Sequence, residues 1–569
     1  CDTPAAACQT IGGAIIKASA GDTIYIAAGT YSEHVTVPKA LTFVGADAAT
    51  TIVDGSGSGR VFNITGGAVT LEGLTLRNGN AGSGNGGALL TASPLTLMAV
   101  TVSGSRAYWG GGIYAEADVV IRASHFAGNT ATGPDVSNDI RKGGGGLYIT
   151  GDLDMADSDV IDNKTAGDGG GLSIRGNAAI TGGTFARNTT TDLSIGSGAA
   201  IAITGDMIMS GTQVISNTSG MAGGAVVAGE QYTGKGGNVT VTNSRFEQNQ
   251  VLRSSGGGLY IYGSLTLLDS QFLTNTAATR KGAVSVVQDA LISGSLFQGN
   301  QALGSSDGWA GAVGVEGTGV ITGSTFLSNT ATTSGGAVRG GPALDIFNSR
   351  FEGNRAGDYG GAVELIGSLH VTGTTFLRNR AGSYAGAVYN SGETVLRSSQ
   401  FLTNTANTDG GALEADGPLD AEGSEFLGNT ATTGNGGAAI VYSTSILNNV
   451  AIEGNSAANG GGLYNGGGGS LQVLTSTLAS NAATSKGGGL YNTDGSTLAE
   501  VAGSTLTGNR AAAGGGIYND AEAAITLTHS FLTSNTAATG GGLQINGGTA
   551  NVANTILAAN AATSSGAAI

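Results

Sequence analysis

Two short phrases alternate along the chain from about residue 86 onward. One phrase is Gly-Gly-(Ala/Gly)-(Val/Leu/Ile), and the other is Phe-x-x-Asn or an aliphatic variant of it. The asparagines that end the second phrase mostly follow one another at steps of 25 or 26 residues. A unit of that length cannot bury its own apolar face, so each unit must stack on its neighbours. The pattern therefore predicts a solenoid.

Within each unit, apolar and polar residues alternate in short runs. In the segment 360–379, Val363 and Leu365 flank Glu364, and the same alternation recurs twice more before the segment ends. Such runs are typical of strands of a few residues. Parallel strands joined by tight turns leave no room for crossover helices. We therefore expect an all-β fold, a right-handed parallel β-helix of about twenty coils with three short strands per coil.

The alternation also predicts which side chains face the core. The aliphatic residue after Gly-Gly-(Ala/Gly) should point inward, and so should the residue two positions later. We expect four inward asparagines at that later position, Asn390, Asn465, Asn492 and Asn519. The residue between these two inward positions of each strand should face water. Tyr464, Tyr491 and Tyr518 should therefore stack outside, one coil apart.

The asparagine that ends each Phe-x-x-Asn phrase should lie at a turn. There its amide can bond to the backbone, and amides of successive coils can form a ladder. The ladder should include Asn129, Asn329, Asn354, Asn379, Asn404 and Asn429.

The N-terminal part of the chain differs from the repeats. Ile11, Ala14, Ile15 and Ala18 have helical spacing and form one apolar face. Such a helix would cover the apolar end of a solenoid. We expect an N-terminal cap over residues 1–20, irregular first coils over 21–85, and regular repeats over 86–569 as one continuous solenoid.

Two cysteines, Cys1 and Cys8, lie close together in this cap. Their spacing favours a local disulfide and hence an oxidising compartment. Two other interpretations stay open: Cys1 as the lipid-modified first residue of a bacterial lipoprotein, or two free thiols.

The composition argues against several classes of protein. The 569 residues include 103 glycines but only 6 prolines, which does not fit collagen. The net charge is −16 and no basic run occurs, which opposes binding to nucleic acid. No run of 18 apolar residues is present, so we expect no transmembrane segment. A chain that begins at Cys1 is consistent with removal of a signal peptide.

The phrases Gly335–Val338 and Phe326–Asn329 resemble the repeats of chlamydial polymorphic outer-membrane proteins. They also resemble the wider group of secreted bacterial right-handed parallel β-helix proteins. Residues 20–31 are similar to the first coil of many such proteins, including pectin-degrading ones. The resemblance covers essentially the whole chain and implies a β-helix and secretion. Chlamydial proteins also carry a C-terminal autotransporter barrel, and nothing like it occurs in this sequence.

The repeat is interrupted by insertions, which in solenoids often collect on the binding face. They occupy residues 133–142, 189–198, 229–237 and 302–310. The turn after Phe-x-x-Asn also holds many of the scarce large aromatic residues, and we expect five of them to be candidate ligand-binding residues: Tyr108, Trp109, Trp309, Tyr359 and Tyr384. Exposed aromatic rings beside polar groups can stack on sugars. Alternatively, these rings cover the bases of loops.

The acidic residues offer candidates for chemistry. Asp152, Asp154 and Asp157 lie in the densest acidic stretch, which could bind calcium or be a solvated strand face. Glu364 and Glu414 are expected two coils apart with Tyr389 between them. We find no catalytic constellation, no metal-ligand spacing among the histidines, and no cofactor motif apart from this calcium candidate.

The chain stops in the middle of a Gly-x-Ala-Ile phrase at Ile569. An exposed last coil would offer unpaired strand edges, so that either the natural chain continues or another subunit covers it. We therefore favour a secreted, non-enzymatic structural or adhesive protein of the bacterial cell surface. Its partners would be copies of itself, other surface components or glycans. The alternative is a polysaccharide-binding or polysaccharide-degrading β-helix, a lyase or hydrolase, that uses the insertions between 104 and 310.

Overall fold

The computed structural model of the protein describes residues 7–133, 142–230, 236–493 and 495–567. The chain divides into two compact units, Cys1–Gln288 and Asp289–Ile569, which are described separately. Each unit is a parallel β-solenoid, and together the described strands make about twenty coils. The all-β class and the β-helix predicted from the sequence are confirmed. Part of the insertion at 133–142 and part of that at 229–237 lie outside the described residues.

A typical coil of the first unit runs through four strands, β13 (Ile113–Ala115), β14 (Val119–Arg122), β15 (His125–Ala127) and β16 (Thr130–Ala131). The next coil repeats them as β17 (Leu147–Ile149), β18 (Leu153–Ala156), β19 (Asp159–Ile161) and β20 (Lys164–Thr165). Equivalent strands pair in parallel and in register. The strands equivalent to β13 form sheet C, and those equivalent to β14 form sheet A. The strands equivalent to β15 form sheet B, and those equivalent to β16 form sheet D.

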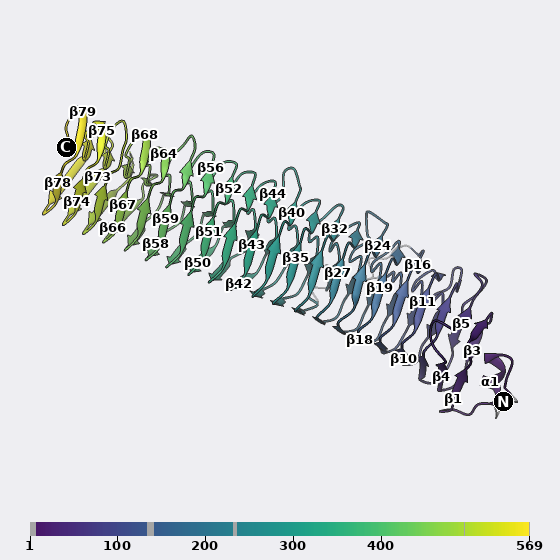
Figure 1. Ribbon diagram of the computed structural model, residues 1–569. Helices are drawn as coiled ribbons and strands as arrows, with labels where there is room; N and C mark the ends of the chain where they lie inside the picture. The colour runs from purple at the N-terminus through teal and green to yellow at the C-terminus, as the bar shows by residue number, and fades with distance from the viewer. Residues whose placement is uncertain (1–6, 134–141, 231–235, 494, 568–569) are drawn as a thin grey trace. The chain divides into compact units, whose positions relative to one another are not determined.

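The second unit repeats this arrangement, and Figure 1 shows its successive strands side by side. One coil consists of β49 (Val363–Leu365), β50 (Ser368–Thr372), β51 (Thr375–Leu377) and β52 (Arg380–Ala381). The following coil consists of β53 (Val388–Asn390), β54 (Thr394–Arg397), β55 (Gln400–Leu402) and β56 (Thr405–Ala406). Parallel pairing joins each strand to its equivalent.

Sheet D is an addition to the three strands per coil that the sequence predicts. Its strands have only two residues in most coils, such as β48 (Arg355–Ala356). The first residue points outward and the second is buried, as in Arg380 and Ala381. Two residues are too short to show a period, which is why the alternation of apolar positions does not reveal them.

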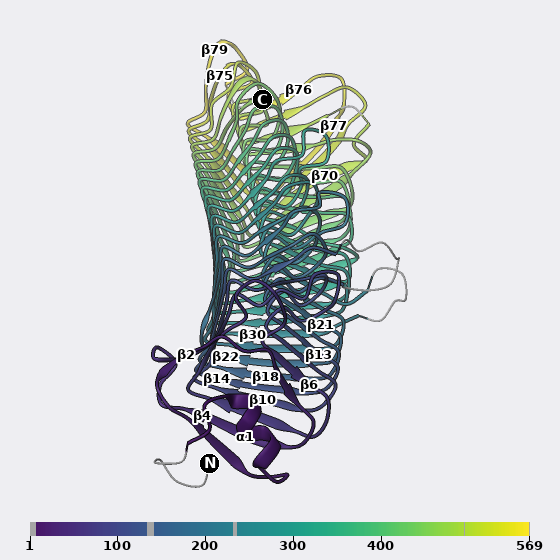
Figure 2. The same cartoon turned by 90° about the vertical axis from the view of Figure 1, so that its right-hand side faces the viewer.

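The predicted N-terminal cap is a single helix, α1 (Ile11–Lys17), with Ile11 and Ile15 buried. It contacts β1 (Thr23–Ile26) and β3 (Val35–Val37), and Figure 2 shows it close to the N-terminus. The carboxylate of Glu33 accepts hydrogen bonds from the first helical backbone amides, Ile11 at 2.9 Å and Gly12 at 3.1 Å. These amides lack partners within the helix, so Glu33 stabilises a helix weakened by two glycines. Cys1 lies outside the described residues, and the Cys1–Cys8 disulfide stays a prediction.

A row of phenylalanine rings lies on the inner face of sheet B in the second unit. Phe326, Phe351, Phe376, Phe401 and Phe426 are each nearly fully buried. Neighbouring rings are stacked, with centroids 4.6 to 5.0 Å apart. Each ring therefore packs against its equivalents in the adjacent coils as well as against its own coil.

Asparagines form a second buried row at the corner between sheets B and D. Asn329 donates from both its backbone N and its Nδ2 to Oδ1 of Asn354, each at 3.0 Å. Its Nδ2 also donates to the carbonyl of Phe297. The same bonds recur from Asn354 through Asn379 and Asn404 to Asn429. In the first unit Asn129 bonds to Asn163 in the same way.

Glycines of the Gly-Gly phrase make the corner before sheet C. Gly360 has φ of +59°, in the left-handed region that favours glycine. A Cβ on Gly361 would lie 2.0 Å from the carbonyl oxygen of Gly386 in the next coil. The second glycine of the phrase is therefore required because the backbone of the next coil leaves no space for a side chain.

The prediction that the middle residue of each sheet C strand faces water is wrong. Tyr491 and Tyr518 are buried, and so are Glu364 and Glu414. These side chains point away from the interior of the coil, but the segment between sheets D and C folds back over them. Tyr464, Tyr491 and Tyr518 do lie one coil apart, with edge-to-face contacts at 5.3 and 5.5 Å. Asn390, Asn465, Asn492 and Asn519 are fully buried, as predicted.

Candidate functional site

The covered outer face of sheet C in the second unit holds a row of charged and phenolic side chains. Its members are Arg339, Glu364, Tyr389 and Glu414, which occupy equivalent positions on four successive strands. These strands are β45 (Val338–Arg339), β49, β53 and β57 (Leu413–Ala415). Parallel pairing places neighbours in the row about 4.8 Å apart. The two glutamates predicted to lie two coils apart with Tyr389 between them are therefore in this row.

Aromatic side chains from the turn before sheet C cover this row. The Trp309 ring lies 4.3 Å from the guanidinium of Arg339. The rings of Tyr359 and Tyr384 stack on each other at 5.3 Å, and Tyr359 also contacts Tyr389 at 5.3 Å. Three of the five candidate ligand-binding residues thus lie over the outer face of sheet C. Tyr359 remains 38% exposed.

Burial dominates the electrostatics of the two glutamates. Burial, with a smaller contribution from the nearby carboxylates of Asp416 and Asp409, raises the pKa of Glu414 to about 8. No described group donates a hydrogen bond to the buried Oε2 of Glu414. Burial also raises the pKa of Glu364, although Arg339 opposes this shift with its Nε 2.9 Å from Oε2. Glu414 is therefore protonated at neutral pH.

Tyr389 links the row to a further acid. Its hydroxyl donates a hydrogen bond of 2.7 Å to Oδ2 of Asp416. Burial and this bond both raise the pKa of Tyr389. Asp409 accepts a bond from the backbone N of Asn435 at 2.6 Å. Asp409 and Asp416 therefore have their own donors, in contrast to Glu414.

The other two predicted ligand residues, Tyr108 and Trp109, lie together in the first unit with ring centroids 5.0 Å apart. Trp109 is stacked on Tyr148 at 6.4 Å, and the ammonium group of Lys142 lies 5.1 Å from its ring. Its Nε1 is buried without a hydrogen-bond partner. Trp109 thus covers sheet C in the first unit, as Trp309 does in the second.

The acidic stretch that was a candidate for calcium binding, with a solvated strand face as the alternative, is spread over the surface of the first unit. Asp154 forms an ion pair with Arg122 at 2.5 Å. Asp152 accepts a bond from the backbone N of Asn177 at 2.7 Å, and Asp157 lies in a tight turn with φ of +49°. In the described part of the chain, no group of three or more His, Cys, Asp or Glu side chains could hold a metal ion.

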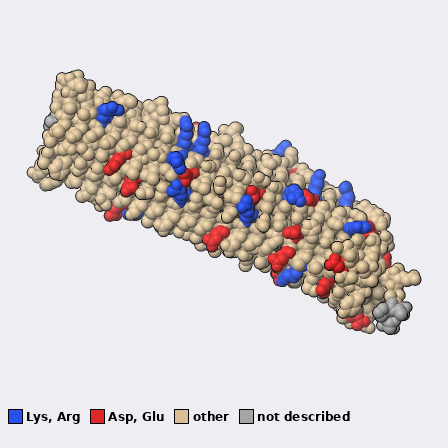
Figure 3. Space-filling model, in the orientation of Figure 1, with Lys and Arg blue, Asp and Glu red and all other residues tan. Residues whose placement is uncertain are grey.

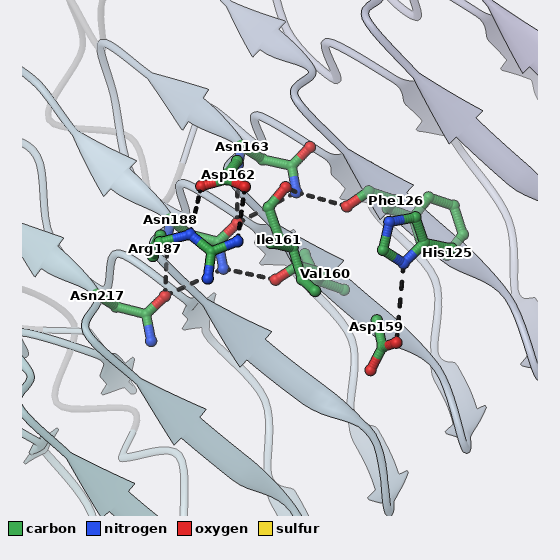
Figure 4. Close-up of polar contacts among 10 residues, drawn as sticks. All are labelled: His125, Phe126, Asp159, Val160, Ile161, Asp162, Asn163, Arg187, Asn188 and Asn217. Carbon is green, nitrogen blue, oxygen red and sulfur yellow. Dashed lines mark hydrogen bonds and ion pairs between the residues drawn. The ribbon is translucent and has the colours of Figure 1, made fainter.

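Two further acids of this stretch also have partners of their own, as Figure 4 shows. Asp162 and Arg187 form a two-bond ion pair in which both N···O distances are 2.8 Å. This pair lies on the outer side of the row that contains Asn163 and Asn188. Asp159 lies 3.7 Å from His125 on the neighbouring strand. These contacts join adjacent coils and explain the charges without a ligand.

One surface feature, a pair of neighbouring arginines, was not predicted from the sequence. Arg355 and Arg380 begin β48 and β52, and they pair in register. Both side chains are exposed. The signal available in the sequence was that each follows a Phe-x-x-Asn phrase directly, where most coils have threonine or glutamine.

No protein-family model matches the chain, and no curated protein matches its sequence. Among solved structures, it is similar to the catalytic unit of a thermostable GH87 alpha-1,3-glucanase from Streptomyces thermodiastaticus strain HF3-3, with 13% identity and a TM-score of 0.17. The match covers 86% of this chain and 64% of the glucanase chain, so the chain spans less than two thirds of that structure. The class of the protein therefore rests on its own strand pairing, which defines two parallel β-solenoid units. Within the described residues, no helix is sufficiently long and apolar to cross a membrane.

Proposed function

We propose that the protein is a non-enzymatic, extracellular structural and adhesive protein of the bacterial cell surface. The observation that supports this proposal is the buried asparagine row of each unit, together with the phenylalanine row from Phe326 to Phe426 in the second unit. Phenylalanine rings and asparagine amides bond or stack from coil to coil. Such rows stiffen the solenoid and leave its outer positions free to vary, which suits a scaffold that presents contact residues. The extracellular location rests on the resemblance of the repeats to those of secreted β-helix proteins.

Self-association through the ends or sides of the solenoid is part of this proposal. Sheets A and B present polar outer faces on which charged side chains pair between neighbouring strands, as with Arg397 and Asp420. Paired charges of this kind also suit contacts between copies.

A second candidate function is the binding or cleavage of a polysaccharide. It is favoured by a polar groove of about 530 Å³ in the first unit, within the predicted range of 104–310. The groove is lined by Gln213, Asn243, Arg245, Glu247, Asp269 and Gln271. Arg245 is already paired with Glu247 at 2.7 Å. Hydrolysis of a glycosidic bond would need two carboxylates at a defined separation, and Glu247 with Asp269 would have to supply them.

Release of reducing sugar distinguishes the two candidates. We expect the protein to release none above a heat-inactivated blank from a panel of acidic and neutral polysaccharides, with or without calcium. The variants Glu247→Gln and Asp269→Asn should behave like wild type, as should the matched control Glu425→Gln. Release that is lost in the two groove variants and kept in the control would replace the first candidate by the second.

A further inference from the structure

We propose that the second unit carries a binding surface for an anionic polysaccharide, formed by Arg355, Arg380, Gly357, Gly382, Tyr359 and Tyr384. This surface, the Arg–Tyr patch, deepens the proposed adhesive function and rests on it. The two arginines belong to sheet D, and the two tyrosines follow four residues after them in the same turns.

Arg355 and Arg380 lack the carboxylate partners that four other arginines of this unit have. Arg339, Arg350, Arg378 and Arg397 each lie within ion-pair distance of a carboxylate. Among the described residues, no carboxylate forms such a pair with Arg355 or Arg380. Arg380 has a single neutral partner, the Oδ1 of Asn407 at 3.3 Å. Both guanidinium groups are therefore available to an anion.

The register makes this arrangement costly in the absence of a ligand. Arg355 and Arg380 lie directly opposite each other on paired strands. Like charges in that position are destabilising. The chain has 40 acidic and 24 basic residues, yet no acidic residue begins a described strand of sheet D in this unit. The strand starts are Gln301, Thr330, Arg355, Arg380, Thr405, Thr430, Ser456 and Ala482.

Glycines and tyrosines complete the patch. Gly357 and Gly382 follow the arginines by two residues, and neither glycine has space for a side chain because a Cβ on each would lie within 2.0 Å of a backbone oxygen. Beyond them lie the stacked rings of Tyr359 and Tyr384, the first of which is 38% exposed. Basic side chains stand out along the edge that carries β48 and β52, as Figure 3 shows.

The chemistry of the patch selects the class of ligand. Guanidinium groups bind carboxylate or sulfate through two parallel hydrogen bonds. The exposed part of a tyrosine ring can contact the C–H groups of a sugar. Two arginines one coil apart, about 4.8 Å, suit a polymer whose acidic groups repeat along its length. Nucleic acid needs a larger cluster of basic residues than the two arginines of this patch.

The test compares the double variant Arg355→Gln/Arg380→Gln with the matched control Arg350→Gln/Arg378→Gln. Both remove two positive charges from the same unit, but the control arginines are already paired with Glu352. Binding is measured by calorimetry to polygalacturonate, dextran sulfate, unmodified dextran and duplex DNA at low and physiological salt. Polygalacturonate and dextran sulfate distinguish a carboxylate ligand from a sulfate ligand.

We expect wild type to bind at least one of the two acidic polysaccharides and not dextran. Affinity should fall at least tenfold in the patch variant and less than twofold in the control, and the unfolding midpoint of the patch variant should not fall, because the substitution removes two like charges that lie opposite each other. Equal loss in both variants, binding to neither acidic polymer, or tighter binding to DNA would overturn the proposal. If the protein instead cleaves the polymer, the proposed function fails while the patch can still be judged from the affinities.

Discussion

Replacing Asn379 by alanine is expected to lower the free energy of unfolding by about 3–5 kcal/mol. Asn379 is almost fully buried. Its Oδ1 accepts bonds from the backbone N and Nδ2 of Asn354, and its Nδ2 donates to the carbonyl of Phe351. The substitution leaves the Asn354 amide and the Phe351 carbonyl without partners in a dry interior. Buried polar groups that lose their partners cost far more than exposed ones.

Guanidinium unfolding and hydrogen exchange together measure this effect. The Asn354 amide should exchange faster by two orders of magnitude or more, because its acceptor is lost. Asn379→Asp should be at least as destabilising as alanine, since it places a negative charge against two acceptors. The exposed control Asn551→Ala should change stability by less than about 0.5 kcal/mol. If Asn379→Ala is as mild as this control, the ladder does not stabilise the solenoid.

Glu414→Gln is expected to remove a large pH dependence of stability. The folded protein keeps the Glu414 proton up to about pH 8, whereas the unfolded chain loses it near pH 4.5. Between these values the folded state binds more protons than the unfolded state. The unfolding free energy of wild type therefore falls as pH rises, by about 1.4 kcal/mol per pH unit from this group.

Unfolding curves at several pH values between 4.5 and 8 provide the measurement. The stability of Glu414→Gln relative to wild type should increase by roughly 3–5 kcal/mol across this window. Asp409, Asp416 and Tyr389 keep their interactions in the variant, so they cancel in the difference. Glu453→Gln, an exposed control on β63 (Ala451–Glu453), should show no such trend. A flat difference for Glu414→Gln would mean that the carboxylate reaches water or finds a donor.

The repeating phrases were sufficient to predict the solenoid because period and burial are linked in a stacked fold. The alternation around Glu364 correctly placed Val363 and Leu365 inside. Asn390 and Asn519 were correctly placed inward for the same reason. These predictions depend only on which side of a strand a residue occupies.

The remaining features depend on how segments fold over one another. Alternation places Glu414 and Tyr491 on the outer side of sheet C, but it cannot show that the preceding turn covers that side. That cover depends on glycine corners such as Gly360 and on rings such as Tyr359. Glu33 bonds to α1 from more than twenty residues away, which no local pattern reveals. Similarly, the pairing of Arg355 with Arg380 becomes apparent only once the register is known.

The central claim is that the protein is a solenoid at the cell surface and acts through contacts with partners. Labelling of intact source cells tests this claim most directly. An antibody against the second unit is applied before and after permeabilisation, and a known intracellular protein serves as the control. We predict full labelling of intact cells and loss of the signal when protease is added from outside. Labelling that requires permeabilisation would contradict the account.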